Sequence, residues 1–176
     1  MGNILFIGGI HGVGKTTVCR DLSNKYGLTY LSASKIISNV RKEEFTKNKK
    51  IDNIDQNQSV LIDALNEYTS EEGWIILDGH FCLLDKYGGI QQIPTRTFSD
   101  LLPKAIIIFT DDVKEISLRL KERDDNVLSL EYLHEFQKKE VDHAFYIAKK
   151  LSVPYLICNP NENLEELYKF VETCIK

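Results

Sequence analysis

The chain has 176 residues, 43% of them hydrophobic, and a formal net charge of −4. This length is enough for one buried core but leaves no room for a second large domain, and the negative charge argues against broad electrostatic binding to nucleic acid. No segment approaches the roughly 20 apolar residues of a membrane-spanning helix, and no signal peptide precedes the first apolar run. We therefore expect a cytoplasmic protein with no membrane partner.

Apolar runs alternate with helical patterns along the chain. The predicted strands cover residues 4–7, 28–31, 74–77, 105–109 and 154–157. Apolar residues recur at helical spacing over residues 18–26, 34–40, 60–68, 113–120 and 164–175. Such alternation implies right-handed crossovers and a parallel sheet that helices cover on both faces. The stretch from about residue 81 to 99 lacks clear periodicity, and a loop of that length in a compact domain is usually functional.

The most specific motif directly follows the first predicted strand. Residues 9–16 read GIHGVGKT and match the phosphate-loop pattern G-x-x-x-x-G-K-[ST]. The glycines allow successive backbone N–H groups to point at phosphate oxygens, and the helix that follows aims its positive dipole end at them. Lys15 is expected to contact the β- and γ-phosphates, and the Thr16 hydroxyl a Mg²⁺ ion. The residues expected to bind the nucleotide are Gly9, Gly12, Val13, Gly14, Lys15, Thr16 and Thr17.

The third predicted strand delivers a carboxylate to the edge of the sheet. It leads into Asp78, Gly79 and His80, at the end of the strand where ligands bind in open α/β sheets. Asp78 is the expected second magnesium group, because a carboxylate there can hold the waters of a phosphate-bound cation. The alternative is a turn that Asp78 starts with Gly79. For His80, contact with a second substrate and a hydrogen bond to a backbone carbonyl both stay open.

Basic residues at two places suggest where a transferred phosphoryl group and an anionic substrate would bind. Arg119 and Arg123 are four residues apart, so their guanidinium groups share one helical face. Phosphoryl transfer needs positive charge of this kind around the equatorial oxygens, and the alternative is a solvated helix end. Arg41 begins a basic run that extends to residue 50, which either attracts an anionic acceptor or is a solvated loop.

On these motifs, the chain resembles the adenylate kinase group of phosphate-loop nucleotide kinases, and most closely its short archaeal-type branch. The resemblance rests on residues 9–17, 77–80, 119–123 and 153–157. It implies a three-layer α/β P-loop NTPase fold, with a five-stranded parallel sheet of order 2-3-1-4-5 and helices on both faces. Residues 1–176 would form a single kinase domain with an acceptor-binding helical insert at about 32–70 and a short lid at about 119–130.

The same resemblance implies roles for single residues. Gly12, Gly14, Lys15, Thr16 and Thr17 would hold the ATP phosphates, Asp78 the magnesium shell, and Arg119 and Arg123 the transferring group. Bacterial adenylate kinases carry Asp-Gly-Phe-Pro-Arg after the third strand, whereas here His80, Phe81 and Cys82 follow the glycine. The acceptor-phosphate arginine is therefore missing at that point, and Arg96 is its candidate replacement. The residues expected at the acceptor site are Ser34, Arg41, His80 and Arg96.

The segment after the second predicted strand bears on the type of reaction. Residues 31–34 read LSAS and contain no carboxylate. A kinase of a neutral hydroxyl needs a general base near the acceptor, whereas an acceptor phosphate is its own nucleophile. The sequence thus favours Mg²⁺- and ATP-dependent transfer to a nucleoside monophosphate, with AMP as the leading candidate, although Asp78 could act as a base in a different geometry.

Two other functions stay open at this point. The chain could be a kinase of another acceptor, such as a nucleoside, a small metabolite or a nucleic-acid 5′ end, because the segment from His80 to Arg96 departs from the family. It could also be a nucleotide-gated ATPase or binding protein that acts through a partner. The sequence does not rank these two alternatives, and it predicts no oligomeric state.

Overall fold

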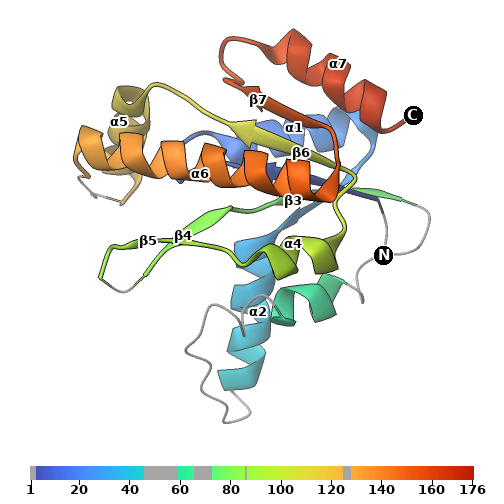
Figure 1. The fold of residues 1–176 in the computed structure, drawn as a ribbon, viewed down its shortest axis with the longest axis horizontal. Coiled ribbons are helices and arrows are strands. Elements are labelled where there is room, and N and C mark those ends of the chain that lie inside the picture. Colours follow the sequence, from blue (N-terminus) through green and yellow to red (C-terminus); the bar gives the residue numbers. More distant parts are fainter. Residues whose placement is uncertain (1–2, 46–58, 66–72, 86, 125–127) are drawn as a thin grey trace.

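The structure is a computed structural model that describes residues 3–45, 59–65, 73–85, 87–124 and 128–176. Its centre is a five-stranded parallel sheet of order β2-β3-β1-β6-β7 (Figure 1). The strands are β1 (Asn3–Gly8), β2 (Thr29–Ser32), β3 (Trp74–Asp78), β6 (Ala105–Phe109) and β7 (Tyr155–Cys158). Counted among themselves, these five strands have the expected order 2-3-1-4-5. The fold class predicted from the sequence is confirmed.

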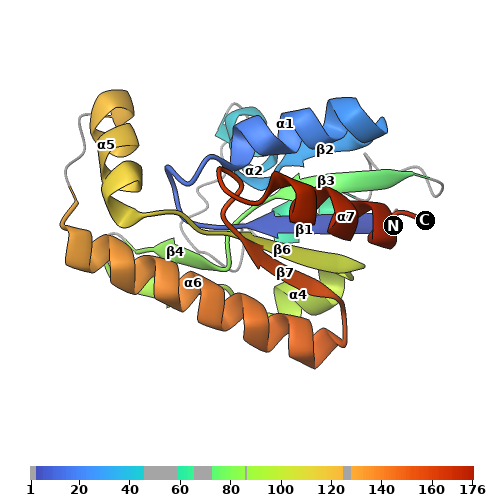
Figure 2. The same ribbon diagram turned by 90° about the horizontal axis from the view of Figure 1, so that it is seen from above.

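Helices cover both faces of the sheet, as Figure 2 shows. They are α1 (Lys15–Tyr26), α2 (Ala33–Phe45), α4 (Thr95–Leu101), α5 (Val113–Asp124), α6 (Leu130–Leu151) and α7 (Leu164–Cys174). Side chains of β1 alternate between two cores, because successive residues of a strand point to opposite faces. Leu5 and Ile7 pack with α1, α5 and α7, whereas Ile4 and Phe6 pack with α2, α4 and the second half of α6.

The stretch from residue 81 to 99, expected to be a loop, contains three short elements. β4 (Cys82–Leu84) and β5 (Ile90–Gln92) form an antiparallel hairpin, and α4 follows it. Strands of three residues and a helix of seven are too short to show a hydrophobic period. The helix predicted over residues 60–68 is present over residues 59–65, and its remaining residues lie outside the described ranges.

α6 is the longest helix in the described ranges, and it was not predicted from the sequence. Its 22 residues begin after Ser129, whose hydroxyl oxygen accepts a hydrogen bond from the N–H of Tyr132 at 3.1 Å. The buried face includes Glu140 and His143 among apolar residues, so polar side chains interrupt the apolar stripe that would have indicated a helix. Within the described ranges, no helix has the length and apolar character needed to cross a membrane.

Candidate active site

The loop between β1 and α1 has the backbone conformation that its glycines allow. Gly9, Gly12 and Gly14 have φ angles of 139°, 84° and 96°, a region that other residues rarely adopt. A Cβ atom at Gly9 would lie 2.7 Å from the carbonyl oxygen of Phe109. The first glycine of the loop therefore packs so closely against β6 that no side chain fits there.

Lys15 begins α1 with its ammonium group inside the loop. Its Nζ donates hydrogen bonds to the carbonyl oxygens of Gly9 at 2.6 Å and Ile10 at 3.2 Å. Burial lowers the pKa of Lys15, while the negative charges of Asp78 and Glu140 counteract that shift. These two carboxylates are therefore the counter-charges of the buried cation.

A cavity of about 380 Å³, which we call the loop cavity, lies over this loop. Its lining consists of Ile10, His11, Gly12, Val13, Gly14, Lys15, Thr16, Thr17, Ser32, Ser34, Lys35, Asp78, His80, Arg119 and Arg123. Of the residues expected to bind the nucleotide, only Gly9 is absent from this lining. The structure thus brings the phosphate loop, Asp78 and both arginines of α5 to one cavity.

Asp78 ends β3 beside the loop. In the sheet it is in register with Ile7 of β1 and Ser32 of β2, and it is buried. The Tyr30 hydroxyl donates a hydrogen bond to its Oδ2 at 3.1 Å. Burial and the negative charge of Asp78 raise the pKa of Tyr30 to about 12, so Tyr30 keeps its proton at neutral pH. One oxygen of Asp78 is therefore held in place by a donor from β2.

A smaller pocket of about 90 Å³, which we call the apolar pocket, adjoins the loop cavity. Its lining consists of Phe6, Ala33, Ser34, Ile37, Leu61, Asp78, Gly79, His80, Leu83, Ile93, Thr97, Phe98 and Leu101. Ser34, Asp78 and His80 line both cavities and mark their junction. None of the described residues in the lining of the apolar pocket is a lysine or an arginine.

His80 lies at this junction and faces Glu140 of α6. Its Nδ1 is 3.7 Å from Oε1 of Glu140 and is buried without a hydrogen-bond partner. The ring also contacts His11 of the phosphate loop, with 4.4 Å between the ring centroids. One of the two interpretations of His80 was a hydrogen bond to a backbone carbonyl, and its Nδ1 atom makes no such bond.

The two arginines of α5 have different surroundings. Arg119 donates from Nη1 to the carbonyl oxygen of Gly12 at 3.0 Å and from Nη2 to Oδ2 of Asp111 at 2.6 Å. The side-chain amides of Asn159 and Asn161 also donate to Asp111. Arg119 thus ties α5 to the phosphate loop. Arg123, one turn further along, is exposed and lines the loop cavity.

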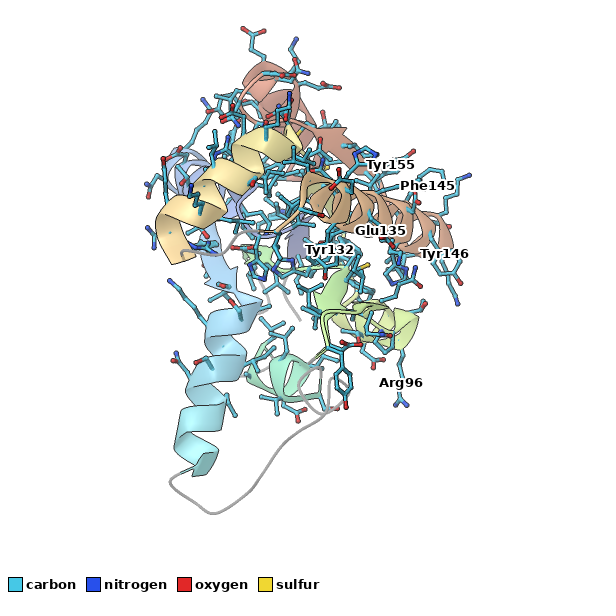
Figure 3. The ribbon with its side chains drawn as sticks, turned by 90° about the vertical axis from the view of Figure 1, so that its left-hand side faces the viewer. Arg96, Tyr132, Glu135, Phe145, Tyr146 and Tyr155 are labelled. Carbon is cyan, nitrogen blue, oxygen red and sulfur yellow. The ribbon has the colours of Figure 1, made fainter. Side chains whose placement is uncertain are left out.

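Of the two arginines expected at the acceptor site, the described residues place only the side chain of Arg96. The side chain of Arg96 is 90% exposed, and its Nε lies 3.5 Å from Oδ2 of Asp100. Figure 3 shows it extending away from the molecule, because α4 turns Thr97 and Phe98 toward the apolar pocket instead. Arg96 therefore lines neither the loop cavity nor the apolar pocket. Arg41 belongs to α2, but its side chain lies outside the described residues.

Two residues of the site were not found from the sequence. Tyr30 lies in β2 directly opposite the middle of β3, and only the strand register brings its hydroxyl to Asp78. Glu140 lies far along the chain on α6 and contacts both the loop and the segment after β3. The sequence signal for Glu140 is a single carboxylate among the apolar positions of a helix. A carboxylate is buried only when it has partners, so this position indicates a residue that contacts polar groups inside the protein.

The residues of the loop cavity fit a nucleoside triphosphate with Mg²⁺. The close-packed glycine loop and the buried ammonium of Lys15 suit phosphate oxygens, and Thr16 and Asp78 offer the hard oxygen donors that Mg²⁺ prefers. Among the described residues, no three His, Cys, Asp or Glu side chains gather as a metal site.

Comparison with known proteins identifies the family. Residues 8–134 match the family model described as the AAA domain, so the chain belongs to that family. The matched region contains the phosphate loop, Asp78 and both arginines of α5, and it ends within α6 before Glu140. The chain therefore has a P-loop fold of the kind that binds nucleoside triphosphates.

The other comparisons are more distant. No curated protein matches the chain. Solved structures that resemble it include a gluconokinase from Sinorhizobium meliloti 1021, with 14% sequence identity and a TM-score of 0.45 over 85% of this chain and 93% of that chain. A likeness of this size does not bear on the acceptor.

Proposed function

We propose that this chain is a Mg²⁺- and ATP-dependent phosphotransferase that acts on a small acceptor with an uncharged hydroxyl group. The observation that carries the proposal is the position of Asp78, which lines both the loop cavity and the apolar pocket. A carboxylate at that junction can face a phosphate-bound metal on one side and an acceptor hydroxyl on the other.

On the nucleotide side, the loop and Lys15 would hold the phosphate oxygens. The Thr16 hydroxyl and the Asp78 carboxylate would bind the magnesium ion or its waters, and bound Mg-ATP supplies the phosphoryl group. Arg123 would approach that group from the exposed end of α5, within the proposed lid at about residues 119–130. Arg119 would act on the same site through the carbonyl of Gly12.

On the acceptor side, the apolar pocket favours a substrate without a phosphate. Four of its lining residues, Ala33, Ser34, Ile37 and Leu61, belong to the proposed acceptor insert at about residues 32–70. A cavity of roughly 150 Å³ holds a benzene molecule, so a pocket of about 90 Å³ suits a small apolar group. The acceptor hydroxyl would then lie at the junction, where Asp78 can accept its proton.

A nucleoside monophosphate is the second candidate acceptor, with AMP as the first to test. Lys35 of α2 favours it, because this cation lines the loop cavity one residue after Ser34 and could bind an acceptor phosphate. In that case the acceptor is already anionic and needs no base. This second candidate also corresponds to the resemblance to the archaeal-type adenylate kinases.

The experiment measures product formation from Mg-ATP with separate panels of nucleosides, sugars, small aromatic alcohols and nucleoside monophosphates. We expect a phosphorylated alcohol, and we expect Asp78→Asn to lower kcat for that acceptor by roughly 100-fold or more, as for loss of a general base. Asp100→Asn is the matched control, because Asp100 is partly exposed and pairs with Arg96 away from both cavities.

The products of this experiment distinguish the proposed function from the two alternatives. Nucleoside diphosphate formation without any phosphorylated alcohol would establish the second candidate in place of the first. Steady ATP hydrolysis that no acceptor stimulates would instead support an ATPase that acts through a partner.

A further inference from the structure

One buried carboxylate joins the two halves of the site. Glu140 is 1% exposed, and its Oε1 accepts hydrogen bonds from the N–H of Gly9 at 3.1 Å and of Phe81 at 2.9 Å. Its Oε2 accepts a third from the N–H of Cys82 at 2.6 Å. The same side chain thus contacts the first residue of the phosphate loop and the segment that follows His80.

Glu140 is an anion in this environment. Burial alone would raise its pKa, but nearby His80, the N–H of Phe81 and the charge of Lys15 outweigh burial and hold the pKa of Glu140 below its usual range. A buried anion with three fixed N–H donors has little freedom to move, because displacement would leave those donors without partners.

His80 has one ring nitrogen directed at this anion. The distance from Nδ1 to Oε1 of Glu140 is 3.7 Å, which is longer than a hydrogen bond but within the range of a charge interaction. Nδ1 and Nε2 lie on different sides of an imidazole ring, so Nε2 is directed away from Glu140. Since His80 lines both the loop cavity and the apolar pocket, Nε2 is the nitrogen available to a ligand there.

We infer that Glu140 is a positioning residue that keeps the His80 proton on Nδ1 and leaves Nε2 as a hydrogen-bond acceptor at the junction of the two cavities. The purpose of this arrangement rests on the proposed phosphotransferase function: Nε2 would orient an acceptor that carries a hydrogen-bond donor. The arrangement itself follows from the contacts of Glu140, because an anion beside one ring nitrogen favours the proton on that nitrogen.

The test reads the tautomer of His80 directly, with no substrate present. Nitrogen-15 NMR of the parent protein is recorded at alkaline pH, and His80→Gln assigns its signals among the four histidines. We expect a protonated Nδ1 and an unprotonated Nε2 in neutral His80. A neutral His80 with its proton on Nε2 would overturn the inference without any substitution of Glu140.

A pair of variants then separates positioning from a purely structural role. Glu140→Gln removes the anion, and we expect the preference for a protonated Nδ1 to be lost in the folded variant. Glu135→Gln, at a partly exposed position of the same helix that pairs with Lys139, should keep the parental signals. Parental His80 signals in folded Glu140→Gln would show that Glu140 only braces the backbone. These outcomes do not depend on finding an acceptor, so they are independent of the proposed function.

Discussion

Arg119 and Gly12 are 107 positions apart in the sequence, and a hydrogen bond of 3.0 Å joins the guanidinium of one to the carbonyl oxygen of the other. The second arm of the same guanidinium is held by Asp111. From its sequence position Arg119 was expected to contact the transferring phosphoryl group, as Arg123 was. The contacts show that Arg119 also fixes the shape of the phosphate loop.

We therefore expect the two arginines to differ when each is replaced by alanine. Arg119→Ala should weaken ATP binding and lower kcat together, and lower the free energy of unfolding by about 1–3 kcal/mol, because Asp111 and Gly12 lose a charged donor. Arg123→Ala should lower kcat more than ATP affinity, as for a group that acts in the transition state. Calorimetry, steady-state kinetics and denaturant unfolding measure these effects.

Lys121→Ala is the control for both variants, since Lys121 is exposed on the same helix and lines neither the loop cavity nor the apolar pocket. Unchanged stability and ATP affinity in Arg119→Ala would contradict the anchoring role. A parental kcat in Arg123→Ala would support the alternative interpretation, in which Arg123 is only a solvated residue at the end of the helix.

Lys15→Ala should weaken Mg-ATP binding by roughly 10- to 100-fold. The reason is that hydrogen bonds from a charged donor contribute about 1.5–3 kcal/mol, and the ammonium of Lys15 is buried at the loop. Titration calorimetry with Mg-ATP measures the change. Lys25→Ala is the matched control, because Lys25 lies on the same helix but over the ring of Tyr168. Equal affinities of the two variants for Mg-ATP would exclude a phosphate-binding role for Lys15.

The phosphate loop and the five strands were predictable because each depends on local pattern, whereas the order of the strands was implied by the resemblance to the nucleotide kinases. GIHGVGKT needs its glycines where φ is positive, and buried parallel strands read as apolar runs. Glu140 and Tyr30 were not predictable, because their roles arise where distant elements meet. Glu140 also interrupts the apolar pattern of α6, and this interruption is one reason why the helix was not predicted.

The acceptor side was predicted least well, for a similar reason. The expected loop over residues 81–99 contains a hairpin and a short helix, and the direction of each side chain depends on how those elements pack. Arg96 was selected by its residue type, but its position on α4 leaves it exposed beside Asp100. The neighbouring Thr97 and Phe98 line the pocket instead.

Tyr30→Phe should lower kcat for the acceptor reaction by about 10-fold while ATP affinity changes little. The substitution removes the hydroxyl that donates to Oδ2 of Asp78, and a hydrogen bond to a charged group contributes about 1.5–3 kcal/mol. Tyr26→Phe is the control, because the hydroxyl of Tyr26 donates to Glu172 of α7, and neither residue lines the loop cavity or the apolar pocket. If Tyr30→Phe and Tyr26→Phe have the same kcat, the hydroxyl of Tyr30 has no part in holding Asp78.

The stability contribution of Glu140 should depend on pH in a defined direction. Its pKa in the folded protein lies below the ordinary value of 4.5, because His80, the N–H of Phe81 and Lys15 outweigh the effect of burial. A carboxylate with a lowered folded-state pKa adds stability above its unfolded pKa, and loses that stability as the pH falls through the folded pKa. Glu140→Gln should therefore be less stable than the parent at neutral pH, by about 2 kcal/mol for the poorly paired N–H groups.

The difference between Glu140→Gln and the parent should narrow as the pH falls below about 4.5. Denaturant unfolding at a series of pH values measures it, with the fluorescence of Trp74, the single tryptophan, as the signal. Glu135→Gln should differ little from the parent throughout, because Glu135 is partly exposed and its pair with Lys139 contributes little in solvent. A stability difference for Glu140→Gln that stays constant from neutral to acidic pH would mean that Glu140 does not stabilise the fold as an anion.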